Sequence, residues 1–93
     1  MKLPAQTTLE EAAALAQALP GALAASVGTL RIDAGELRAF DSSTLALLMQ
    51  ARRMAQAAGL GFEVSAAPAK LTQLAELYGV QELLAFEPPA ASA

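Results

Sequence analysis

Three small polar residues in a row, Asp41, Ser42 and Ser43, stand directly before the longest stretch of helical apolar spacing in the chain. Side chains of this kind at a helix start can accept hydrogen bonds from backbone amides that have no partner within the helix. A phosphate carried by one of the serines would meet the positive end of the helix dipole. The pattern predicts a helix cap, and beyond it either a partner contact or a phosphorylation site at Ser42 or Ser43.

The residue types that most enzymes use are scarce. The chain has no His, no Cys, no Trp and one Tyr, which excludes Ser-His-Asp and Cys-His catalysis and zinc sites built from thiolate or imidazole. No Gly-rich run ends in Lys-Ser or Lys-Thr, so a P-loop is also excluded. Asp33 and Asp41 are the only aspartates, and their positions do not suggest a paired acid and base. We therefore expect a chain that is not an enzyme and needs no metal or cofactor.

The length and charge of the chain limit its class and its partners. The 93 residues predict one small domain, and alanine supplies much of the apolar share of 55%. No stretch approaches the ~20 apolar residues of a membrane span, and the first residues do not form a signal peptide, so we expect a cytoplasmic protein. Six basic and nine acidic residues give a net charge of −3, and only Arg52 and Arg53 are adjacent bases. Nucleic acid is therefore not an expected partner.

The elements that must position the serines alternate between helix and strand. Thr8 and Glu11 have the spacing of a capping box, and the apolar face of the helix that follows consists of Leu9, Ala12, Ala13, Ala16, Leu19 and Leu23. Pro20 and Gly21 predict the end of this helix or a kink in it. Alternating apolar and polar residues predict strands over 29–33 and 61–65. An extended segment over 37–40 leads into a helix over 42–58, which Gly59 ends.

The C-terminal part predicts a third helix that starts at Pro68 and ends at Gly79, with Tyr78 on its inner face and its hydroxyl bonded to backbone. Residues 80–86 form a last short element, and 87–93 a disordered tail. Residues 3–5 could add an edge strand. This order predicts a single α/β domain over residues 1–86, a small mixed sheet with helices packed mainly on one side.

The outward side of helix 42–58 is the second candidate surface. Leu47, Leu48, Ala51, Met54, Ala55 and Ala58 share one face, and Leu45 and Met49 lie a third of a turn or more away, beside Arg52, Arg53 and Gln56. Apolar residues bordered by arginines fit a protein contact, because Met and Arg are enriched at interfaces. Core packing is the favoured alternative for Leu45 and an equal one for Met49. Leu77 is either contact surface or an ordinary exposed leucine.

Residues 40–48, with the sequence Phe-Asp-Ser-Ser-Thr-Leu-Ala-Leu-Leu, resemble the signature of STAS domains, the fold of bacterial anti-sigma factor antagonists. The likeness continues through Gly59, the next strand and residues 68–71, and covers about 29–86. It implies a STAS-type fold in which Asp41, Ser42, Ser43 and Thr44 contact a partner. Within the family, residues 45–48 and 74–80 are most similar to the STAS subunit on the cytosolic ATPase of a phospholipid ABC transporter.

The resemblance implies an ABC-transporter ATPase as the partner, which would hold the chain at the inner membrane without inserting it. Thr44 stands where antagonists commonly have Gly, and about eight residues precede the first helix, where the family has more strand. Both departures favour the transporter subunit over a freestanding antagonist. The alternatives are an antagonist that binds an anti-sigma kinase and is switched by serine phosphorylation, or a small-ligand sensor that holds a nucleotide or lipid.

Overall fold

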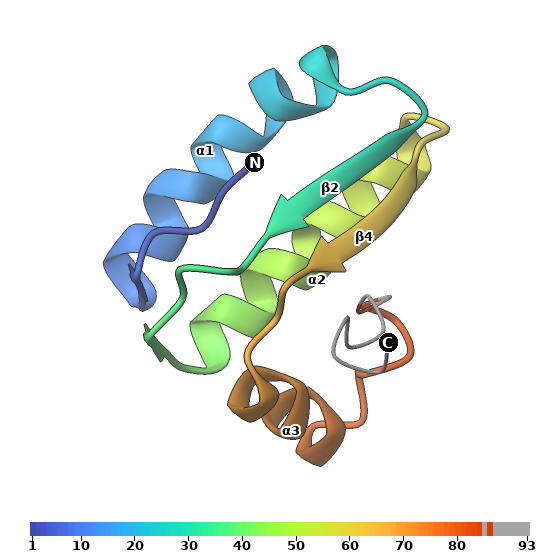
Figure 1. The fold of residues 1–93 in the computed structure, drawn as a ribbon. Helices are drawn as coiled ribbons and strands as arrows, with labels where there is room; N and C mark the ends of the chain where they lie inside the picture. The colour runs from blue at the N-terminus through green and yellow to red at the C-terminus, as the bar shows by residue number, and fades with distance from the viewer. Residues whose placement is uncertain (85, 87–93) are drawn as a thin grey trace.

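The chain alternates short strands with helices, as the computed structural model shows for residues 1–84 and 86, which are the residues described below (Figure 1). The elements in chain order are β1 (Gln6–Thr7), α1 (Leu9–Ala25), β2 (Thr29–Asp33), β3 (Ala39–Phe40), α2 (Ser42–Ala57), β4 (Gly61–Ser65) and α3 (Ala69–Leu77). The expected α/β class is confirmed, and the strands expected over 29–33 and 61–65 have the predicted bounds. The predicted tail, 87–93, lies outside the described residues.

The strands form two small sheets, in which β2 pairs with β4 and β1 pairs with β3. Both pairs are parallel, and so are the single bridges from Lys2 to Asp33 and from Val64 to Phe86. The segment before α1 therefore runs first beside β2 and then beside β3. Its pairing extends from Lys2 to Thr7, whereas the sequence predicted an edge strand over 3–5. In the described part of the chain, parallel pairs take the place of a mixed sheet because helices connect the strands.

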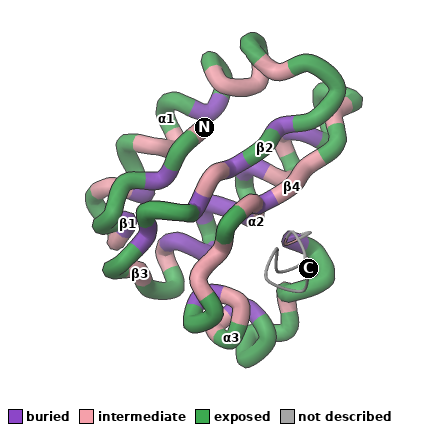
Figure 2. Tube along the Cα trace, in the orientation of Figure 1, coloured by how far each residue is buried: buried purple, intermediate pink, exposed green. Residues whose placement is uncertain are grey.

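The helices lie mainly on one side of the β2–β4 pair, with α2 behind both strands in Figure 1 and α1 beside α2. Leu30 and Ile32 of β2 are buried, whereas Thr29 and Arg31 are exposed on the other face. Figure 2 shows the buried residues where the helices meet the strands. The main buried side chains of this core are Leu3, Leu19, Leu30, Ile32, Leu48, Val64, Leu71 and Leu84.

The first helix differs from the sequence prediction. α1 continues through Pro20 to Ala25, although Pro20 can donate no backbone hydrogen bond to the preceding turn. Pro20 is exposed, while Leu19 is fully buried and Leu23 packs against the core. Apolar contacts on both sides of the proline thus keep the helix in place. The predicted inner face was too wide, because Leu9 is 69% exposed and Ala13 is also exposed.

The ends of the other two helices follow the sequence more closely. α2 begins at Ser42, and Gly59 and Gly79 have φ values of 75° and 72°, as expected of glycines that follow a helix. α3 begins directly after Pro68. Residues 81–84 form a turn, and Phe86 pairs with Val64 beside β4, so the last short element combines turn and strand.

We predict that the α1 cap gives folding stability a specific pH dependence. The Thr8 hydroxyl and amide donate to the Glu11 carboxylate at 2.7 and 3.1 Å, and these bonds lower the pKa of Glu11. A lowered pKa stabilises the fold above the ordinary glutamate pKa of about 4.3, and the stabilisation disappears as the pH falls through the folded value. Glu11→Gln should therefore be less stable than wild type at neutral pH, and the difference should shrink in acid, as measured by urea unfolding.

Glu10→Gln is the matched control. It removes the same charge from the same turn of α1, but no hydrogen bond of the Glu10 side chain is found among the described residues. If both variants lose the same stability with the same pH dependence, the effect belongs to the helix dipole and the capping account is wrong.

Candidate partner-binding site

The start of α2 is capped by its own chain. The Asp41 carboxylate accepts from the Ser43 amide at 2.8 Å, and the Asp41 carbonyl accepts from the Thr44 amide at 3.0 Å. The Asp41 amide in turn donates to the Thr44 hydroxyl oxygen at 3.3 Å. The capping role predicted for Asp41 is confirmed, whereas no hydrogen bond from either serine hydroxyl is found in the described part of the chain. The amides of Asp41, Ser43 and Thr44 are thus already bonded.

Thr44 has a role inside the fold. Its side chain is fully buried, and its hydroxyl donates to the Thr7 carbonyl at the end of β1. Thr7 is itself fully buried and donates to the Pro4 carbonyl at 3.0 Å. The prediction that Thr44 contacts a partner is therefore wrong for this conformation, because no part of its side chain reaches the surface. Its hydroxyl instead connects the first strand to the start of α2.

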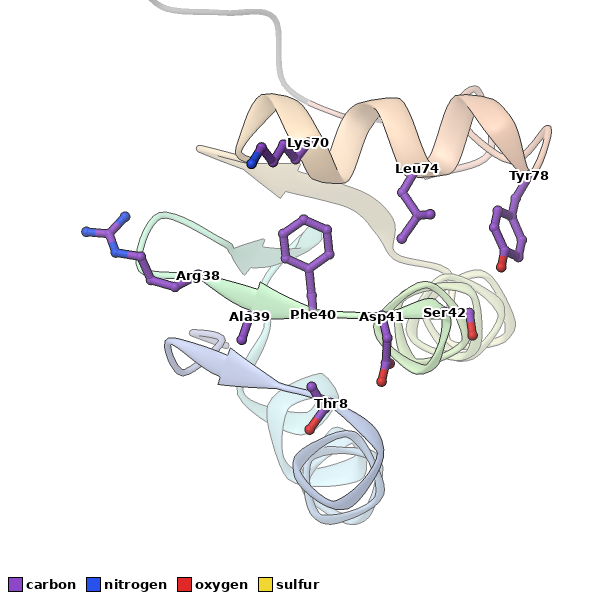
Figure 3. Close-up of a pocket in the computed structure, with 9 residues that line it drawn as sticks. All are labelled: Thr8, Arg38, Ala39, Phe40, Asp41, Ser42, Lys70, Leu74 and Tyr78. Carbon is purple, nitrogen blue, oxygen red and sulfur yellow. The ribbon is translucent and has the colours of Figure 1, made fainter.

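The two serines face different depressions of the surface. Ser42 is exposed and lines an open hollow between α3 and the β3–α2 junction (Figure 3). Ser43 is half-buried and lines a smaller, largely apolar groove between α1 and α2, together with Leu9, Ala13, Ala46 and Gln50. A partner seated over the start of α2 would contact both serines from two sides.

The outward side of α2 brings together most of the other predicted contact residues. Met49, Arg53 and Gln56 follow Ser42 by seven, eleven and fourteen residues. Each separation is close to a whole number of helical turns, so the four side chains lie on one side of α2. Ser42, Arg53 and Gln56 are exposed, and Met49 is half-buried against the core. Arg52 lies beside these four residues on α2 and is half-buried. Leu45 is buried, which confirms the core alternative for it.

The hollow between α3 and the β3–α2 junction was missed by the sequence analysis. Its apolar lining is Phe40, Leu74 and Tyr78, and Arg38 and Lys70 lie at one end (Figure 3). Tyr78 is 57% exposed, so its predicted place in the core is wrong. The seven-residue spacing from Leu71 placed it on the inner face, but α3 ends at Leu77, and Tyr78 is the residue that caps it. Leu77, for which the sequence left a contact surface or an ordinary exposed leucine open, is 80% exposed and does not line the hollow.

Over residues 1–84 and 86, no three His, Cys, Asp or Glu side chains gather as a metal site would need, and no helix has the length and apolarity to cross a bilayer. A family model described as "Mlab, STAS domain" matches residues 1–85. The match includes the first strand and α1, which the sequence resemblance did not cover. None of the curated proteins matches the chain.

We predict that the Thr44 hydroxyl is worth more to stability than its methyl group. Thr44→Val keeps the shape but leaves the Thr7 carbonyl and the Asp41 amide without this partner, which should cost about 1–3 kcal/mol. Thr44→Ser keeps the hydroxyl and loses one methyl group, which should cost about 0.8 kcal/mol. Chemical denaturation of both variants measures the difference. A valine variant as stable as wild type would show that the connection between β1 and α2 is not needed.

Proposed function

The chain belongs to the STAS domain family, in its MlaB-type branch, and we propose that it binds and supports the cytosolic ATPase of a phospholipid-transport ABC complex. STAS domains are generally non-enzymatic binding domains, and the chain is a STAS-type protein-interaction domain. In this proposal ATP is the partner's ligand. The chain itself stays cytoplasmic and lies at the inner membrane only through the ATPase.

One observation carries the proposal: the outward side of α2 is a continuous ridge from the capped start of the helix to its last turn. The ridge combines Ser42, Met49, Arg53 and Gln56, with Arg52 beside it and Asp41 exposed at its end. Met and Arg are enriched at protein interfaces, and a protruding helix side offers them to a partner without any change in the fold. No ion pair involves Arg52 or Arg53 within residues 1–84 and 86.

The capping bonds favour a packed contact over a phosphorylation switch. A phosphate on Ser42 or Ser43 would gain most from free amides at the helix start. The amides of Ser43 and Thr44 are already held by Asp41, and the Asp41 amide is held by Thr44. A phosphate would have to compete with these bonds, whereas a partner that packs against the serine side chains leaves them intact.

We predict that charge at the two serines prevents binding to the ATPase. Ser42→Glu and Ser43→Glu should fold normally, because a negative charge is tolerated at a helix start. Both should lose the ATPase in a pull-down, because an unpaired charge is costly in a closed interface. Ser42→Ala and Ser43→Ala, the matched controls, should retain binding.

Intact-mass measurement of the protein from its native cells separates this proposal from the antagonist alternative. A large population heavier by one phosphate, mapped to Ser42 or Ser43, would favour the phosphorylation switch. If the glutamate variants bind the ATPase as tightly as wild type, the start of α2 is not the contact.

We further predict that Arg53 affects how fast the complex forms. Charged residues at the rim of an interface mainly change the association rate and its dependence on salt. Arg53→Gln should therefore slow association with the ATPase at low salt and flatten the salt dependence, as measured by surface plasmon resonance. Arg31→Gln is the matched control, because Arg31 lies on the sheet face away from the helices, paired with Glu63 at 3.4 Å. Equal effects of both variants would mean that only net charge matters.

A further inference from the structure

The hollow beside Ser42 has an apolar part and a cationic part. We call it the α3 hollow and define it by Phe40, Leu74 and Tyr78 on its apolar side and by Arg38 and Lys70 at its cationic end. In Figure 3, Leu74 and Tyr78 extend from α3 toward the strand and helix below, and the Phe40 ring rises toward α3. Arg38 and Lys70 both lie on the side of the hollow away from Ser42, Arg38 beside the strand and Lys70 on α3.

The residues that line the hollow include two basic side chains, Arg38 and Lys70, and one acidic side chain, Asp41. Arg38 and Lys70 are exposed, and the two ion pairs found over residues 1–84 and 86 involve other residues. Asp41 is the one acidic residue among those that line the hollow. Its carboxylate accepts from the Ser43 amide, and in Figure 3 it points away from the two cations. The cationic end is therefore complementary to an acidic group supplied from outside.

The apolar side is also open to a partner. Tyr78 is 57% exposed and Leu74 is half-buried. An exposed tyrosine beside a hollow is the kind of side chain that dominates binding energy when a partner covers it. A partner segment that presents an apolar side chain to Tyr78 and a carboxylate to Arg38 and Lys70 would satisfy both parts of the hollow.

We propose that the α3 hollow receives a segment of the ATPase in which an apolar residue lies next to an Asp or Glu. This inference rests on the proposed function, because it names the part of the same partner that would sit beside Ser42. The apolar residue would pack against Tyr78 and Leu74, and the carboxylate would reach the cationic end. The hollow would then select the partner by its charge pattern, while the α2 ridge supplies the adjoining contact.

Photo-crosslinking of the reconstituted complex tests the chemistry of the occupant. With a benzophenone side chain in place of Tyr78, the full-length chain should crosslink to the ATPase. Mass spectrometry should identify a peptide with an apolar residue beside an acidic one. A peptide without Asp or Glu beside the crosslinked position would overturn the inference. So would a crosslink to a second copy of this chain or to a lipid, or the absence of any crosslink in a complex that forms.

Affinity measurements on the same complex separate this inference from the proposed function. Tyr78→Ala should weaken binding by about tenfold or more, a typical effect for an interface anchor. Arg38→Gln with Lys70→Gln should slow association and reduce its salt dependence. The controls are Leu77→Ala, an exposed apolar residue that does not line the hollow, and Arg31→Gln on the far face. Neither control should change affinity appreciably.

The outcomes differ for the two proposals. If wild type binds the ATPase and the hollow variants bind equally well, the inference is wrong and the proposed function stands. If wild type does not bind the ATPase, both are wrong.

Discussion

A buried hydroxyl stands where the first strand, the third strand and the second helix meet. Thr44 donates from its hydroxyl to the Thr7 carbonyl at the end of β1 and accepts from the Asp41 amide at the end of β3. Both threonines are fully buried, so water cannot replace the bond between them. A buried polar group without a partner costs about 1–3 kcal/mol, a large share of the stability expected of a domain this small. The start of α2 is therefore tied to the strand ends by hydrogen bonds that the fold cannot easily lose.

The hydrogen bonds of Thr44 determine which side chains at the start of α2 face the surface. Because Thr44 faces inward, the two residues before it point to two different sides of the helix start. Ser42 faces the α3 hollow, and Ser43 faces the groove along α1. Asp41 uses one carboxylate oxygen for the cap, so its other oxygen and the serine hydroxyls are the polar side-chain groups at the helix start that a partner can reach. A glycine at position 44, as antagonists commonly have, would lack the hydroxyl and could form neither of these two side-chain hydrogen bonds. Thr44 therefore connects α2 to β1 in a way that the common antagonist pattern does not.

Local signals predicted most of the fold. The caps at Thr8 and Asp41, the glycines after two helices and the alternation in β2 each depend on neighbouring residues, so the sequence alone was sufficient. A helix end at Pro20 was wrongly predicted because the propensity of a proline says nothing about Leu19 and Leu23, which pack against the core on either side of it. The strand pairing of residues 2–7 was only partly predicted, because β1 has two residues and is too short to show an alternation of apolar and polar residues.

The candidate site was predicted less completely, for a physical reason. The outward residues of α2 follow from helical geometry, so Met49, Arg53 and Gln56 could be grouped from their spacing. Thr44 could not be assigned in the same way, because threonine suits both a cap and a contact. Its burial depends on a carbonyl 37 residues away in the chain. The α3 hollow forms where residues 38–42 lie near α3. The spacing of apolar residues within one segment cannot predict how two segments distant in the sequence pack together.

The two sides of the candidate surface are held by separate parts of one core. α2 is fixed by Thr44 and by buried residues along its length, including Leu48 and Ala51. α3 is anchored through Leu71 and Ala75, and the chain after it folds back so that Leu84 is also buried. Because Leu71, Ala75 and Leu84 belong to the same buried core as Leu48 and Ala51, core packing helps to hold α3 beside Ser42. A partner that bridges the α2 ridge and the hollow would therefore meet a preformed surface, with little ordering to oppose binding.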